Sequence, residues 1–219
     1  MRRLSALFCC LTLLTLGIGS LPLVSQAQAQ LPSDIHPVTL SRLPPVTPDD
    51  LDEEGQRLLA ERGNFNPGPG PTHVTIYSPN GRNLGIPMGT GSFVGARNFQ
   101  LATLIVAREI DQQYEWSNHE PAGLQVGLEQ SVIDVVKYDR DVAGLAEEDA
   151  MFITFGRTLM REHQVSSELW ADMVRLFGRQ GTVTLMTVMG EYLKVGIMLN
   201  AVDQHMPPGR DALLPPLER

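Results

Sequence analysis

The sequence predicts an all-α protein, on three observations. In the second half of the 219-residue chain, apolar residues recur at helical spacing over several long stretches. Residues that favour helix starts and stops flank those stretches. No stretch shows sustained alternation of apolar and polar residues, and the β-prone runs 74–77 and 183–188 lie in helical surroundings, so we do not expect strands there.

The first 95 residues contain little regular structure. Residues 30–47 are rich in Pro and Ser and predict an extended arm. Thr47 and Pro48 then suit the start of a helix that ends near Gly63. Gly and Pro punctuate the segments 64–71 and 80–95, which predicts loops on either side of a short apolar piece, His73 to Tyr77.

Residues 48–219 are expected to form one helical domain, with most of its helices after residue 95. Six segments have helical character: 96–113, 114–127, 132–138, 147–163, 166–178 and 181–203. The first is apolar on most sides, which predicts a central helix. In the second, Pro121 is comfortable only in a first turn, so that helix could instead begin near Ser117. Ser166 or Ser167 caps the fifth, and Gly178 closes it.

Residues 1–29 have the pattern of a secretory signal peptide. Arg2 and Arg3 precede an apolar run over 4–24, and small residues at 25–29 form an A-x-A cleavage site. A membrane anchor is the alternative, which the small-residue break and the cleavage site disfavour. We therefore expect a mature chain that starts at Gln30, is periplasmic or secreted, and is not stably inserted in a membrane.

Composition excludes several functions. Cleavage after Ala29 would remove Cys9 and Cys10, the two cysteines of the chain, which excludes thiol peroxidase, disulfide exchange and cysteine-ligated metal. A net charge of −8 with 6% aromatic residues argues against nucleic acid as a partner. No H-x-x-x-H or H-E-x-x-H motif is present, so we expect neither a metal nor a cofactor.

The densest polar cluster covers residues 111–120. If it is helical, Glu115 and His119 share one face, and such a pair suits proton transfer because a carboxylate can orient an imidazole. An ordinary surface ion pair explains the same spacing. The other histidines (His36, His73, His163 and His205) lie where solvated side chains are typical, although His73 follows a Pro/Gly loop and could approach a site.

The segment 95–127 resembles carboxymuconolactone decarboxylase, of the alkylhydroperoxidase D-like superfamily. The resemblance rests on Tyr114-Glu115-Trp116-x-x-His119 followed by Ala122 and Gly127. Residues 190–192, 199–201 and 207–209 resemble the closing helix and tail of that family, so the resemblance covers most of 48–216. It implies an alkylhydroperoxidase D-like helical bundle assembled as a homotrimer or hexamer, with the site near subunit contacts.

The resemblance also implies a choice of chemistries. Peroxidase members carry a Cys-x-x-Cys pair, and Gln112 and Glu115 occupy those positions here, so the redox branch is disabled. Decarboxylase-like members keep a Glu and a His, matched by Glu115 and His119. A helix Glu that the family often carries would fall at Gln100, and a Gln cannot relay a proton.

These features predict decarboxylase- or lyase-type acid–base chemistry on a small carboxylated lactone or related acid. His119 would deliver or remove the proton and Glu115 would orient it. Arg97 or Arg108 would hold a substrate carboxylate, unless each forms a structural ion pair, and Tyr114 and Trp116 would add substrate contacts. The competing hypothesis is a non-catalytic helical oligomer or binding protein on the same scaffold. A cavity lined by His119 would favour the enzyme.

Overall fold

A computed structural model of the chain describes residues 31–61, 68–79 and 93–217. Within these ranges the secondary structure is helical, with no strand and a single isolated bridge between His36 and Ser41. The all-α prediction is therefore confirmed for the described residues. The predicted signal peptide at 1–29, residues 80–92 of the predicted 80–95 loop and residues 64–67 of the 64–71 loop lie outside them.

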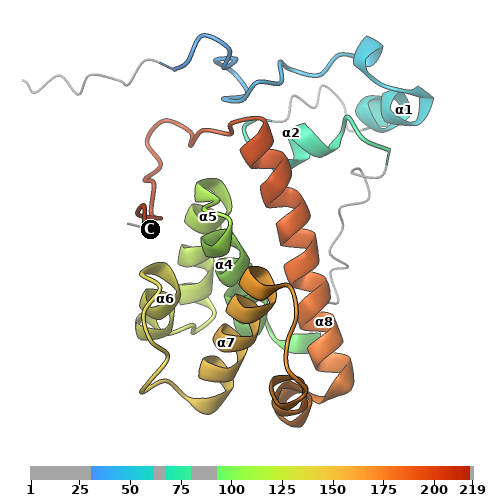
Figure 1. The fold of residues 1–219 in the computed structure, drawn as a ribbon. Helices are drawn as coiled ribbons and strands as arrows, with labels where there is room; N and C mark the ends of the chain where they lie inside the picture. Colours follow the sequence, from blue (N-terminus) through green and yellow to red (C-terminus); the bar gives the residue numbers. More distant parts are fainter. Residues whose placement is uncertain (1–30, 62–67, 80–92, 218–219) are drawn as a thin grey trace, which may run out of the picture. The chain divides into compact units, whose positions relative to one another are not determined.

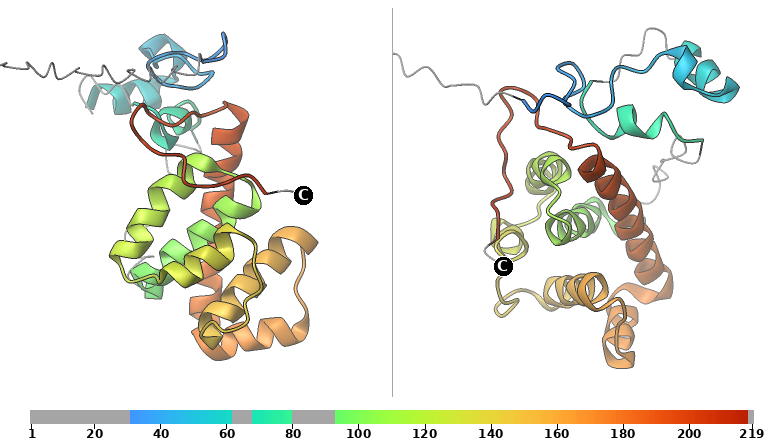
Figure 2. Two further views of the ribbon diagram at one scale, coloured as in Figure 1. Left: turned by 90° about the vertical axis from the view of Figure 1, so that its left-hand side faces the viewer. Right: turned by 45° about the horizontal axis from the view of Figure 1, so that its top comes forward.

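The core is built around α4 (Ala96–Glu109), which α5 (Gln113–Gln125), α6 (Gln130–Lys137), α7 (Glu147–Glu162) and α8 (Ser167–Ala201) all contact (Figures 1 and 2). Every residue of α4 from Leu101 to Arg108 is buried. This confirms the expected central helix, because a helix that is apolar on most sides needs neighbours on most sides.

The junction between α4 and α5 sets the position of the 111–120 cluster. Asp111 adopts a positive φ of 52°, which ends α4 and turns the chain. The side chain of Gln112 then accepts hydrogen bonds from the amides of Tyr114 and Glu115 and so caps α5. Pro121 lies inside α5, and the alternative start near Ser117 is wrong: the helix already begins at Gln113.

Helix α8 consists of two parts. Ser166 caps it through the amide of Leu169, and Gly178 has non-helical angles (φ 67°, ψ 166°), as expected for a residue that closes one helix before the next. By length and composition alone, α8 is apolar enough to cross a membrane. Its buried residues include Leu185 and Val188 of the core, and core helices satisfy the same criterion.

The expected helix from Pro48 to Gly63 is divided. A 3-10 turn (η1, Pro48–Asp50) is separated from α1 (Glu53–Glu61) at Leu51, whose backbone is extended. Thr47 starts η1 as expected, and its amide and hydroxyl both donate to the Asp50 carboxylate at 2.8 Å. The Leu51 side chain is buried, and this burial stabilises the chain at the point where the helix is interrupted.

The arm expected at 30–47 is anchored as well as extended. Ile35 and Leu40 are buried, and the amide of His205 donates to the carbonyl of Leu40 at 2.8 Å. The amide of Arg42 donates to the carbonyl of Val202 at 2.8 Å. The arm is therefore held against the end of α8, because its backbone groups find partners there.

Close packing of α7 on α4 predicts the effect of Gly156→Ala. A Cβ at Gly156 would lie 2.6 Å from Cγ2 of the buried Ile105, so we expect a loss of about 1–3 kcal/mol in the free energy of unfolding. Gly190→Ala is the matched control: no atom lies within 4 Å of its Cβ, and better helix propensity should stabilise by about 0.5–1 kcal/mol. Urea denaturation measures the unfolding free energy of both variants. Equal effects of the two substitutions would contradict close packing of Gly156 against Ile105.

Candidate functional site

A cavity of about 260 Å³ lies among α5, α8 and the short helix α2 (Pro71–Thr75). Its lining combines carboxylates, hydroxyls, an amide, two rings and two apolar side chains. These residues are Pro71, Thr72, Thr75, Glu115, Asn118, His119, Glu191, Tyr192 and Val195. The structure therefore brings two predicted site residues, Glu115 and His119, into one cavity, a condition that favours an enzyme over a plain surface pair.

His119 is held on one side by α4. Its Nδ1 lies 2.7 Å from Oε1 of Gln100, and its Nε2 lies 3.3 Å from Oε2 of Glu115. With the amide oxygen of Gln100 facing it, Nδ1 carries a proton and donates. In the neutral imidazole the lone pair is then on Nε2, the nitrogen beside Glu115. Gln100, expected only as a lost proton relay, is thus the group that fixes the ring.

Glu115 is a buried carboxylate with one oxygen unused. Its side chain is 6% exposed, and Oε1 has no hydrogen-bond partner among the described residues. It lies in the first turn of α5, where the helix dipole stabilises negative charge. A buried acceptor without a donor is costly, so this oxygen is available to a bound molecule.

Aromatic side chains enclose the imidazole. The ring of Tyr192 meets the ring of His119 edge to face at 4.9 Å, and Phe99 lies 5.7 Å from Tyr192. Burial and the charge of Glu115 raise the pKa of Tyr192 well above its usual range, against a hydrogen bond with Thr103 that lowers it. Tyr192 therefore stays protonated. Sequence reasoning did not single it out, because its nearness to His119 depends on α8 packing against α4.

Tyr114 positions the wall of the cavity instead of lining it. Its hydroxyl donates to the carbonyl of Pro69 at 2.6 Å, just before α2 begins. On the same segment, the amide of Gly70 donates to the side chain of Gln204 at 3.2 Å. His73 faces away from the cavity lining: it is fully buried, and its Nε2 lies 3.0 Å from the carbonyl of Leu43 in the arm. Burial lowers the pKa of His73, which keeps it neutral.

Trp116 is not brought to the cavity. It is fully buried in the core, and its indole N–H donates to Glu120. Lys137 completes this group, with Nζ 2.9 Å from Oε1 of Glu120. The substrate contact expected of Trp116 is therefore corrected to a core position, because neither its ring nor its N–H is available.

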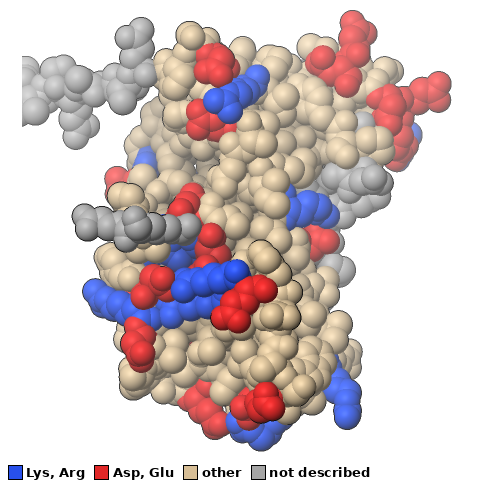
Figure 3. All heavy atoms as spheres, viewed as in Figure 1, with Lys and Arg blue, Asp and Glu red and all other residues tan. Residues whose placement is uncertain are grey.

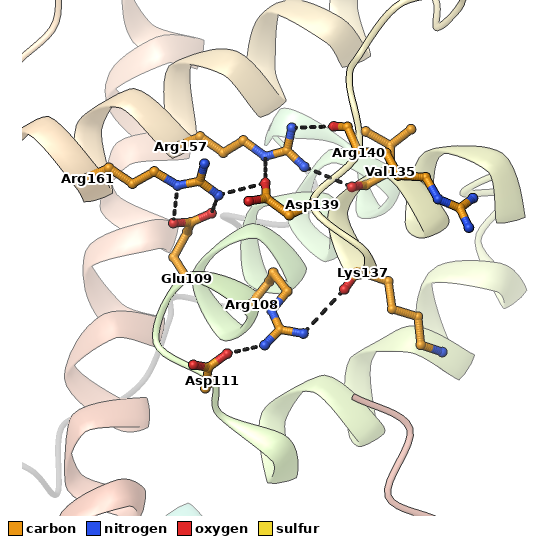
Figure 4. Close-up of polar contacts among 9 residues, drawn as sticks. All are labelled: Arg108, Glu109, Asp111, Val135, Lys137, Asp139, Arg140, Arg157 and Arg161. Atoms are coloured by element: carbon orange, nitrogen blue, oxygen red, sulfur yellow. Dashed lines mark hydrogen bonds and ion pairs between the residues drawn. The ribbon is translucent and has the colours of Figure 1, made fainter. Parts of the chain in front are cut away.

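Arg97 and Arg108 also lie away from the cavity. Arg97 pairs with Asp149 at 2.7 Å and with Glu129. Arg108 is 1% exposed and donates to Asp111 and to the carbonyl of Lys137 (Figure 4). It also donates to the carbonyl of Pro215. The alternative stated for them, a structural ion pair, is what the geometry shows, and neither is placed to hold a substrate carboxylate.

Among the residues that the structure describes, the cavity lining contains neither arginine nor lysine. Its two carboxylates are Glu115 and Glu191, and Glu191 pairs with Lys194 at 2.7 Å. On the face drawn in Figure 3, most basic side chains lie next to acidic ones, in groups separated by uncharged surface. Across the described ranges, no group of three His, Cys, Asp or Glu side chains is placed to hold a metal ion.

No protein-family model matches the chain, and no curated protein matches it.

Gly70→Ala tests the anchoring of the cavity wall. Gly70 has φ 133°, and an added Cβ would lie 2.6 Å from the hydroxyl of Tyr114. We expect a loss of about 1–3 kcal/mol in unfolding free energy, with changed amide NMR signals at Thr72 and Thr75. Gly68→Ala is the control, because no atom lies within 4 Å of its Cβ. Unchanged signals in Gly70→Ala would show that this anchor does not position α2.

A second polar cluster lies outside the cavity, around Asp139 (Figure 4). Arg161 donates to Asp139 at 2.7 Å and also to Glu109, and Arg157 lies 3.2 Å from Asp139. Burial raises the pKa of Asp139, but the hydrogen bond from Arg161 and the nearby arginine charges outweigh it and hold that pKa below its usual range.

Asp139→Asn should therefore destabilise in a pH-dependent way. A depressed carboxyl pKa stabilises the fold above the unfolded pKa of about 3.9, and this contribution is lost as pH falls through the folded pKa. We expect a cost of about 1–2 kcal/mol at pH 7, reduced by partial exposure, that shrinks towards pH 3. Asn also tolerates the positive φ of 50°. Urea titrations at several pH values measure the gap, and a constant gap contradicts the ion-pair account.

Proposed function

We propose that this cavity performs proton-transfer chemistry on a small organic molecule, with His119 as the group that exchanges the proton. One observation carries the proposal: Gln100 occupies Nδ1 of His119, which leaves Nε2 beside Glu115 in the cavity. An imidazole held at one nitrogen, with the other nitrogen in a cavity, suits general acid–base catalysis.

The proposed chemistry uses both protonation states of His119. Neutral His119 takes a proton at Nε2, and the carboxylate of Glu115 at 3.3 Å stabilises the resulting imidazolium. The same imidazolium then returns its proton to carbon or oxygen. Gln100 keeps the ring in place through both steps without changing charge. In this scheme Glu115 stabilises the charge at the reacting nitrogen. Gln100, and not Glu115 as expected, orients the ring.

A decarboxylase or lyase reaction is the form of this chemistry that the resemblance implies. Loss of CO₂ from a carboxylated lactone leaves an electron pair that the lactone carbonyl delocalises, and protonation at the γ-carbon completes the reaction. His119 would supply that proton. The family assignment and the alkylhydroperoxidase D-like bundle are part of the proposal; the decarboxylation is carried by the resemblance alone, and proton transfer by His119 does not depend on it.

The proposal also includes export and self-assembly. The signal-peptide pattern of residues 1–29 supports a periplasmic or secreted protein. An apolar groove lined by residues such as Leu159, Met186 and Leu193, together with the 56% exposed Ile197 on α8, supports self-assembly, and the resemblance implies a homotrimer or hexamer. Light scattering on the purified chain measures its mass directly.

His119→Ala tests the proposed function. The mature protein and the variant are given a panel of small lactones, with and without a carboxylate, in D₂O, and deuterium uptake and CO₂ release are recorded. We expect turnover that falls by about 100-fold or more in the variant, because general acid–base groups contribute that much. His36→Asn is the control: His36 lies in the arm, and it lines neither this cavity nor the apolar groove proposed for self-assembly.

Two results would contradict the proposal. Equal turnover by His119→Ala would place the chemistry elsewhere. No turnover by a folded wild-type protein would favour the non-catalytic binding protein on the same scaffold.

A further inference from the structure

The charge of the cavity lining opposes the kind of substrate that the resemblance implies. Glu115 and Glu191 line it, and the described lining contains neither arginine nor lysine. The arginines expected to bind a carboxylate, Arg97 and Arg108, have other partners. A carboxylate that entered would leave water without a cation to replace it, which is unfavourable.

His119 does not supply the missing cation. If it is protonated, its charge lies 3.3 Å from Oε2 of Glu115, and the pair is neutral as a whole. If it is neutral, the charge of Glu115 is uncompensated within the pair. In neither state does the pair attract an anion.

The unused oxygen of Glu115 calls for a donor. Oε1 is buried, has no partner among the described residues, and belongs to a side chain that lines the cavity. An N–H or O–H group on a bound molecule satisfies it, and an ammonium group gives the stronger, charge-assisted bond.

We propose that the cavity binds small, non-anionic molecules that present a hydroxyl or ammonium donor to Oε1 of Glu115, and that it discriminates against carboxylates. This inference rests on the proposed function for its location, since both use the same cavity. The volume of about 260 Å³ limits the ligand to a small molecule. The rings of His119 and Tyr192 and the side chain of Val195 offer apolar surface to its body.

Three probes of nearly equal size separate the possibilities: benzyl alcohol, benzylamine and benzoate. Each is titrated into ¹⁵N-labelled mature protein at neutral pH, where benzylamine is an ammonium ion and benzoate an anion. The amide signals of Thr72, Thr75 and Asn118 report binding in the cavity. We expect benzyl alcohol and benzylamine to bind at least about tenfold more tightly than benzoate, and their relative order shows which donor is preferred.

Glu115→Gln identifies the carboxylate responsible. The change keeps the size of the side chain and removes its charge, so benzylamine should lose about tenfold in affinity and its advantage over benzoate should shrink. Glu191→Gln should have a smaller effect, because Lys194 already neutralises Glu191. Glu162→Gln, on the exposed end of α7, is the control and should leave all three affinities unchanged.

Three outcomes overturn the inference: benzoate binding as tightly as the other two probes, an advantage of benzylamine over benzoate that Glu115→Gln leaves undiminished, or no shift at the cavity with any probe. These measurements involve no turnover. The expected order of affinities with no effect of His119→Ala on turnover would therefore overturn the proposed function alone. Turnover that depends on His119 and prefers carboxylated lactones would overturn the ligand class alone.

Discussion

Helix α4 is buried from Leu101 to Arg108, and the other large helices of the described chain contact it. That constraint reaches the cavity through the residues just before this stretch. Phe99 and Gln100 directly precede Leu101 on the same helix; Phe99 contacts Tyr192 of α8, and Gln100 contacts His119 of α5. Because α4 is held on several sides, the position of Gln100 relative to His119 depends on the packing of the whole core.

The residue of α4 that hydrogen-bonds to His119 is Gln100, whose amide carries no charge. A carboxylate at position 100 would place a second negative group on the imidazole, opposite Glu115. The amide fixes the same ring orientation without that charge. The pair of Glu115 and His119 therefore keeps a single carboxylate, beside the nitrogen that faces the cavity, and its free oxygen is left for a ligand.

The helices were largely predictable from the sequence because local signals coincide with their ends. Ser166 and Gly178 mark the two ends of the first part of α8, and Gly95 precedes α4 as expected. Spacing within one helix also predicted that Glu115 and His119 would meet. The start near Ser117 that Pro121 suggested was wrong, because a proline inside α5 is tolerated when the rest of the helix is well capped and packed.

Contacts between distant segments were beyond such reasoning. Arg97 pairs with Asp149, 52 positions away, and Arg108 meets a carbonyl of the C-terminal tail, so neither could be assigned from local sequence. The same holds for Tyr192 and for the arm, whose backbone groups at Leu40 and Arg42 bond to His205 and Val202 and carry no sequence signal. Gln100 was noticed as a departure, but only the tertiary structure shows its bond to His119.

The tautomer of His119 tests the central claim most directly. Long-range ¹H–¹⁵N NMR of the histidine rings, at a pH where His119 is neutral, distinguishes a proton on Nδ1 from one on Nε2. The hydrogen bond to Gln100 predicts the proton on Nδ1, and Gln100→Leu should remove that preference. A proton found on Nε2 in the wild-type protein would contradict the account, because the nitrogen beside Glu115 would then have no lone pair with which to accept a proton.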